Sequence, residues 1–302
     1  MTIRQDMLRT ASRATYLLND STELVINFIN KQMCQDGGLK ARSDQSDLYY
    51  TVFGIEVLLA LGAELPTERI SKYLQQFADG KSLDLVHLAC LARCWGDIRQ
   101  SQSQGLMTDT LSGIAHHIEN YRSSDGGYSN SPRTGRGTVY GCFLALGAYQ
   151  DLNIEMKNCD ALADCVKSLR TSDGAYSNEP GCKVGSTPAT AAALTLQYYL
   201  DIPIDYSAAG WLQRQFVTSG GFIATPALRE VGIPDLLSTA TALHALALIG
   251  SSIDQIKKGE KCLDFLDSLW CGDGGFCGSW ADRTPDCEYT YYGLLAMGHL
   301  SE

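Results

Sequence analysis

Carboxyl groups stand at the start of several stretches whose pattern is typical of helices, which makes them candidates for acid chemistry. Asp84 precedes His87 by three residues, so a helix would place both side chains on one face, where they could form a hydrogen-bonded pair. Asp235 opens a similar stretch, and Asp286 and Glu288 bring two carboxyls to the start of the last one. Burial and like charge can keep such a carboxyl protonated at neutral pH, as a proton donor requires. These five residues are the candidate catalytic groups.

Each candidate also has a structural explanation. Aspartate is a favoured first residue of a helix, where its side chain accepts backbone N–H groups and contributes about 1 kcal/mol. The recurrence of aspartate at four helix starts, the three above and Asp47, is what capping predicts. His87 could equally be a buried histidine with satisfied hydrogen bonds. Capping does not account for Glu288.

Aromatic side chains accompany these carboxyls. Helical spacing from the aspartates directs six of them toward the interior that the helices would enclose: Tyr49, Tyr50, Phe53, Tyr140, Tyr289 and Tyr292. The face of each ring could stabilise a passing carbocation by about 0.5 to 2 kcal/mol, so several rings together would favour chemistry that passes through cations. An apolar core would need the same residue types, and for any single ring the two explanations remain open.

Phosphate and metal ligands find little support in the sequence. It lacks a glycine-rich phosphate loop, an acidic diphosphate–metal motif and a basic cluster near the candidate residues. Arg136 belongs to a set of basic residues in the long turns, which could hold an anionic head group or could be solvated turn charges. The eleven cysteines are scattered, with no C-x-x-C pair and no tight Cys/His group. We therefore expect no metal and no cofactor.

A repeat positions these residues. Turns containing glycine recur six times, about every 45 to 50 residues, at 34–39, 77–82, 124–130, 172–178, 218–226 and 272–280. A polar-faced helical stretch precedes each turn and a less polar one follows it. Three of the following stretches, from Asp47, Asp235 and Asp286, align without a gap on D-x-x-x-T-x-x-[GA]-[IL]. A unit of this size cannot bury its apolar face alone, so the units must stack.

Six helix pairs are enough to close a ring, with the helices rich in small residues packed side by side inside and the more polar helices outside. The repeat alone also allows an open superhelix; the predicted fold class is all-α, an α/α toroid of six helix-pair repeats. Because the repeats run from Cys34 to Leu300 without a visible linker, we expect one domain over residues 1–302.

Composition narrows the partners. A net charge of −10 without a basic run argues against nucleic acid and against an anionic membrane surface. No window approaches the 18 or more apolar residues of a membrane span, and the first twenty residues lack the apolar core of a signal peptide. These features predict a cytoplasmic protein whose cysteines remain thiols.

The turns and inner stretches resemble those of the prenyltransferase β-subunit and class II terpene cyclase superfamily, over nearly the whole chain. In that superfamily the resemblance implies an α/α toroid. Protein prenyltransferases hold zinc with Asp-x-Cys and a later His, and these positions are matched here by Asp235, Leu237 and Tyr289, of which only the first is a usual zinc ligand. Class II cyclases protonate their substrate with the middle carboxyl of Asp-x-Asp-Asp-Thr-Ala. The stretch from Asp235 keeps the first Asp and the Thr-Ala, with Leu237 at the acid position.

The resemblance therefore implies a single-domain class II cyclase of the merosterolic acid synthase type. Such an enzyme would convert a linear polyprenyl or prenylated aromatic substrate into a polycyclic product by general acid catalysis, and Leu237 would contact that substrate. A hydrophobic isoprenoid is the expected small-molecule partner, with no obligate protein partner. Two alternatives remain, a zinc-dependent prenyltransferase β-like subunit and a non-catalytic isoprenoid-binding toroid.

Overall fold

Each helix of the inner ring begins at a side chain that caps it. The computed structural model describes residues 1–40, 42–101, 108–251 and 255–301, and within them six helices form this ring: α4 (Leu48–Ala60), α6 (Leu85–Ser101), α8 (Val139–Leu152), α10 (Thr187–Tyr199), α12 (Leu236–Leu248) and α14 (Cys287–Leu300). The residue before each helix accepts a backbone N–H of the first turn; these residues are Asp47, Asp84, Thr138, Ser186, Asp235 and Asp286. Capping therefore explains the recurrent aspartate, and Thr or Ser replaces it in the repeats that lack one.

The threonine four residues after the aspartate ties the inner helix to the glycine turn that precedes it. Thr51 Oγ1 donates to the backbone oxygen of Asp47 (2.6 Å) and accepts the backbone N–H of Leu39 in the turn (2.8 Å). Thr239 and Thr290 accept a backbone N–H of their own turns in the same way, at 3.0 and 3.2 Å. The D-x-x-x-T pattern is thus an architectural signature and does not by itself mark a reacting group.

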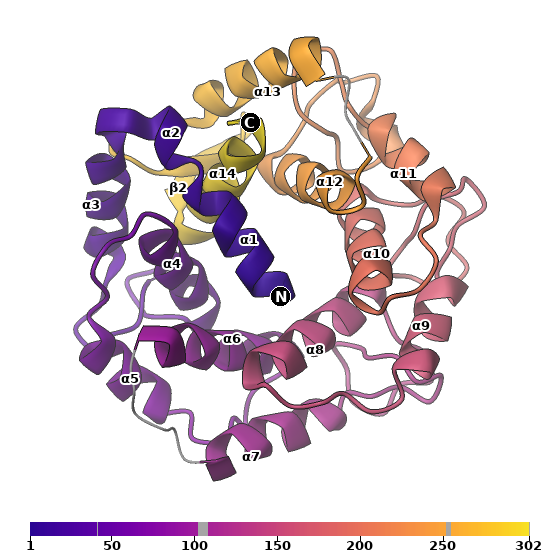
Figure 1. Cartoon of the computed structure of the whole chain (residues 1–302), viewed down its shortest axis with the longest axis horizontal. Helices are drawn as coiled ribbons and strands as arrows, with labels where there is room; N and C mark the ends of the chain where they lie inside the picture. The colour runs from indigo at the N-terminus through magenta and orange to yellow at the C-terminus, as the bar shows by residue number, and fades with distance from the viewer. Residues whose placement is uncertain (41, 102–107, 252–254, 302) are drawn as a thin grey trace.

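A second ring of helices surrounds the first and closes with it (Figure 1). Its members within the described residues are α3 (Thr22–Gln32), α5 (Thr67–Gln75), α7 (Thr108–Glu119), α9 (Cys159–Ser168), α11 (Tyr206–Gln213) and α13 (Gln255–Leu269). The last inner helix, α14, packs on the first, α4. Gly274 in the last turn, with φ +103°, lies so close to α3 that a Cβ there would overlap the backbone oxygen of Leu24. The predicted α/α toroid of six helix pairs is therefore confirmed.

The last repeat departs from a purely helical fold. Its turn extends into a short antiparallel hairpin of β1 (Phe276–Ser279) and β2 (Asp282–Asp286), which leads directly into α14. A 3₁₀ turn, η2 (Pro226–Leu228), lies in the loop of the repeat before it. All eleven cysteines are free thiols. Among the described helices, none is both long and apolar enough to cross a bilayer.

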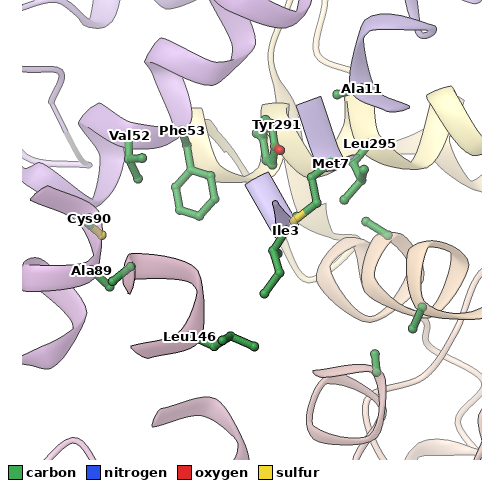
Figure 2. Packing of buried hydrophobic residues seen from close by; sticks show 14 of the residues in the cluster. Ile3, Met7, Ala11, Val52, Phe53, Ala89, Cys90, Leu146, Tyr291 and Leu295 are labelled. Carbon is green, nitrogen blue, oxygen red and sulfur yellow. The ribbon is translucent and has the colours of Figure 1, made fainter. Parts of the chain in front are cut away.

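The N-terminal helix α1 (Ile3–Ser12) lies across the ring, an arrangement that the repeat does not predict. It is followed by α2 (Thr15–Leu18) and η1 (Asn19–Ser21), and it contacts α4, α8 and α14. In Figure 1 the N-terminus lies near the centre of the ring. Figure 2 shows Ile3 and Met7 among the buried side chains of the inner helices, where their exposure is 4% and 7%. Because α1 meets the last turn of α14, it covers the carboxyl ends of the inner helices.

Gly298 near the end of α14 marks a close approach of α1, since a Cβ there would overlap the backbone oxygen of Thr10. We expect Gly298→Ala to displace α1 and to lower the free energy of unfolding by about 1 to 3 kcal/mol, measured by urea denaturation. Gly259→Ala is a matched control, because no atom lies within 4 Å of that added Cβ in α13. It should stabilise the protein by up to about 1 kcal/mol through helix propensity. Equal stability of the Gly298 variant and the parent would contradict this packing.

A candidate active site inside the ring

The inner helices present matching positions to a cavity of about 80 Å³, which has room for about five to eight water molecules. Counted from the capping residue, these are the second, fifth, sixth and ninth positions, which a helix places on one face. The wall contains Tyr49, Val52 and Phe53 of α4, Val86, Ala89, Cys90 and Arg93 of α6, and Tyr140, Phe143, Leu144 and Gly147 of α8. Tyr292 of α14 and Ile3 and Arg4 of α1 complete most of it. The cavity is therefore off-centre, against α4, α6, α8 and α14.

Four of the six predicted aromatic residues lie in this wall. The Tyr49 and Phe53 rings are edge to face with centroids 5.1 Å apart, and Phe53 and Tyr292 are 5.6 Å apart. Tyr140 is the fourth. The other two, Tyr50 and Tyr289, are outside the wall because each is the third residue after its cap, which a helix turns away from the second and sixth positions.

Glu288 lies at the amino end of α14, where it contacts the aromatic wall. The Tyr49 hydroxyl donates to Glu288 Oε1 at 2.6 Å. The pKa of Glu288 is raised to about 7: burial is the largest cause and nearby Asp286 adds to it, while the Tyr49 hydrogen bond and Arg42 oppose the shift. At neutral pH this carboxyl is therefore divided between its acid and carboxylate forms.

Asp286 is occupied by structural contacts. It is 4% exposed, accepts the backbone N–H of Tyr289 at 2.9 Å, and lies 3.3 Å from two nitrogens of Arg42. Burial raises its pKa, while the Tyr289 N–H and Arg42 oppose the change. Asp286 caps α14 and places a negative charge beside Glu288.

The predicted Asp84–His87 pair is present, with Oδ1 and Nδ1 2.7 Å apart. It lies at the amino end of α6, where the Asp84 side chain is 55% exposed. Burial opposes ionisation of Asp84, but its hydrogen bonds to the His87 backbone and ring lower its pKa overall. An acid that stays ionised in this way does not suit a proton donor.

None of the five predicted catalytic residues is a wall residue, and three of the predicted site residues, Asp235, Leu237 and Arg136, also lie apart from Glu288. Asp235 caps α12, and burial raises its pKa while its hydrogen bonds to Ser238 oppose the shift. Leu237 on the same helix is half-buried and is absent from the wall, since the cavity does not extend to α12. Arg136 is exposed in the turn before α8. The structure therefore does not bring these three residues together with Glu288.

A buried ion pair between neighbouring inner helices escaped the sequence analysis. Arg93 in α6 binds both carboxylate oxygens of Glu56 in α4, through Nε and Nη2. The Glu56 side chain is fully buried, and the guanidinium lies 5.6 Å from the ring centres of both Phe53 and Tyr291. Arg93 therefore adds a charged group to a wall for which the sequence predicted aromatic residues.

A second charged layer anchors α1. Arg4 donates from Nη1 to Asp97 in α6 at 2.6 Å and from Nε to Asp151 in α8 at 2.7 Å. The exposed fractions of the three side chains are 5%, 0% and 3%. Both aspartates lie at the thirteenth position after the cap, one turn beyond Arg93. One buried cation therefore joins the N-terminal helix to two inner helices.

The repeat register contained a signal for the first of these pairs. Glu56 and Arg93 are each nine residues after the aspartate of their own repeat, so opposite charges occupy the same position on adjacent inner helices. Each is also a charge within an otherwise apolar run. No comparable signal predicts Arg4, because α1 stands outside the repeat.

Within the part of the chain that the structure describes, no three His, Cys, Asp or Glu side chains are grouped so that they could hold a metal ion. At the positions that the sequence comparison with zinc enzymes singled out, Asp235 is a helix cap and Tyr289 lies against Gly278.

Comparisons with known proteins agree with this architecture. A family model described as the prenyltransferase alpha-alpha toroid domain matches residues 6–101, 102–222 and 204–301. No curated protein matches the chain by sequence.

Solved structures of two kinds of protein are similar to this one. Candida albicans protein geranylgeranyltransferase-I complexed with GGPP has a TM-score of 0.70 and 16% identity, with 90% of this chain and 89% of that chain covered. A variant of the type II terpene cyclase MstE from Scytonema, in complex with its product merosterolic acid A, has a TM-score of 0.62 and 12% identity, covering 95% and 97% of the two chains. The apo form of MstE gives 0.58 and 12%, with the same coverage. At these identities the likeness is one of fold.

Proposed function

Because the chain belongs to the prenyltransferase alpha-alpha toroid family, we propose that it is a cyclase of linear isoprenoids that starts its reaction by protonating a carbon–carbon double bond. The observation that carries this proposal is the Glu288 carboxyl, which is hydrogen-bonded to Tyr49 in the aromatic wall of the ring cavity and is partly protonated at neutral pH. Glu288 is the proposed proton donor.

The proposed reaction begins when Glu288 transfers its proton to one carbon of the double bond, which leaves a tertiary cation on the other. The π electrons of a second double bond in the chain then form a carbon–carbon bond to that cation and close a ring. The faces of Tyr49, Phe53 and Tyr292 surround the path of the charge. Loss of a proton or addition of water ends the sequence.

The cavity limits the part of the substrate that it can enclose. At about 80 Å³ it is below the 300 to 1,000 Å³ of common ligand pockets, so it can enclose only part of a polyprenyl chain. A longer polyprenyl chain or a prenylated aromatic substrate, which the resemblance suggests, would extend beyond this volume or move side chains of the wall. The solved relatives support an isoprenoid as ligand, since their structures contain GGPP and merosterolic acid A.

Cyclisation in deuterated water tests the proposal directly. Purified protein is incubated with linear isoprenoids of increasing length, and products are separated by gas chromatography and identified by mass spectrometry. We expect a cyclic product that carries one non-exchangeable deuterium, because the initiating proton comes from an acid in exchange with solvent. Ligand binding without any cyclic product would support a non-catalytic isoprenoid-binding toroid, and a requirement for added zinc would support a prenyltransferase.

The rate should fall as the pH rises through about 7. Glu288 donates only in its protonated form, and its pKa is raised to about 7, so the competent fraction is high below that pH and decreases tenfold per pH unit above it. The measurement is kcat between pH 5.5 and 8.5, with circular dichroism at each pH as the control for folding. A rate that increases throughout this range would contradict Glu288 as the acid.

A further inference from the structure

The Arg93 guanidinium is held in place with one edge unused. Its Nε and Nη2 bind Glu56, and the plane lies near the rings of Phe53 and Tyr291. Among the described residues, Nη1 has no hydrogen-bond partner. Arg93 belongs to the cavity wall, and its side chain keeps 20% exposure. A fixed donor therefore faces the cavity.

Arg93 differs in this respect from Arg4, the other cation of the wall. Arg4 is divided between two carboxylates, and its side chain is only 5% exposed. Of the two, Arg93 is the donor that an occupant of the cavity would meet.

The surrounding charges decide which kind of acceptor suits this donor. Three arginines, Arg4, Arg93 and Arg99, lie among three carboxyls, Glu56, Asp97 and Asp151. Counted as ionised groups, the three arginines and the three carboxylates balance, and Glu288 adds a fourth carboxyl on α14. The region has no excess of positive charge, so a buried carboxylate or diphosphate would be desolvated without compensation. An uncharged oxygen accepts the same hydrogen bond without that cost.

We propose that Arg93 binds the oxygen of an uncharged isoprenoid, such as an alcohol or ketone, and thereby selects oxygenated neutral substrates over prenyl diphosphates. This inference rests on the proposed function for the orientation of the isoprenoid, because it takes Glu288 as the group that protonates the double bond. Arg93 is nine residues and Glu288 two residues after its cap, a difference of about 10 Å along parallel helices. The oxygen would lie deep in the ring while the double bond at the other end of the chain reaches Glu288.

Calorimetric titration with three ligands of equal carbon skeleton tests this selection. The ligands are geraniol, the hydrocarbon that lacks only its hydroxyl, and geranyl diphosphate. We expect geraniol to bind about tenfold or more tighter than the hydrocarbon, as for a hydrogen bond to a charged donor, and also tighter than the diphosphate. Equal affinity for the alcohol and the hydrocarbon, or tighter binding of the diphosphate, would overturn the inference.

The variant must not leave Glu56 buried and unpaired. Glu56→Leu/Arg93→Met replaces the whole pair by apolar side chains, which buried ion pairs commonly tolerate. In this variant geraniol and the hydrocarbon should bind within about twofold of each other, whereas Arg9→Met, a change at a side chain that is 61% exposed, should keep the parental preference. A double variant that is folded by circular dichroism and still prefers geraniol would refute the role of Arg93.

Binding and turnover separate the two proposals. Selection for the alcohol without any cyclic product would leave the Arg93 inference standing and refute the cyclase. Cyclisation without selection for the alcohol would support the cyclase and refute the Arg93 inference.

Discussion

Glu288→Gln is expected to lower kcat for cyclisation by about 10²- to 10⁴-fold, the range that a positioned general acid contributes. Glutamine keeps the size of the side chain, and its amide oxygen can still accept the Tyr49 hydroxyl, which lies 2.6 Å from Oε1 in the parent. The amide has no acidic proton to give. Substrate binding should therefore persist while product formation stops, and single-turnover assays with titration of the ligand would measure both.

Asp235→Asn is the matched control for this variant. Asp235 is also a carboxyl at the amino end of an inner helix, and burial also raises its pKa, but it accepts a hydrogen bond from Ser238 of its own helix, whereas Glu288 accepts one from Tyr49 in the cavity wall. Asparagine caps a helix about as well as aspartate, so the fold should be kept and kcat should change less than about twofold. The reverse pattern, in which the Asp235 variant is inactive and the Glu288 variant is active, would move the proton donor to α12.

Arg4→Met should lower the free energy of unfolding by about 3 to 5 kcal/mol, because it removes the buried cation that Asp97 and Asp151 both bind. Without Arg4 the folded-state pKa of both carboxyls rises, so the folded variant binds more protons than the unfolded chain. The variant should therefore regain part of its stability as the pH falls toward 5. Urea denaturation followed by circular dichroism at pH 5 and pH 8 measures both effects.

Arg9→Met on the same helix provides the comparison. The Arg9 side chain is 61% exposed and lies 3.4 Å from Asp6. An exposed pair of this kind contributes little, so the expected loss is below about 0.5 kcal/mol. Similar losses in the two variants would mean that Arg4 is not an anchor for α1.

The sequence was sufficient to predict the ring because the fold repeats itself. Every inner helix has a capped start, and several repeats also share a threonine bound to the turn and a glycine at a close approach, so the copies together reveal the period. Four aromatic positions of the wall followed from helical spacing alone. The sequence also directed Tyr50 and Tyr289 toward the interior, but each is one residue after the second position of its helix, a rotation of 100° that takes its side chain out of the wall.

What the sequence did not predict depends on contacts between distant segments. Arg4 meets Asp151 across 147 positions of the chain, and no periodicity announces a helix that lies outside the repeat. The raised pKa of Glu288 likewise depends on the packing of α4 against α14, because only the closed ring buries this carboxyl and brings the Tyr49 hydroxyl to it.

The position of α1 has a consequence for how a ligand enters and leaves the ring. The carboxyl ends of the inner helices are covered by this helix, so we expect the proposed substrate to enter and its product to leave at the amino ends, where Glu288 lies. Product must then leave by the same end before the next substrate molecule can bind. Accumulated product should therefore inhibit the proposed cyclisation by competing with substrate.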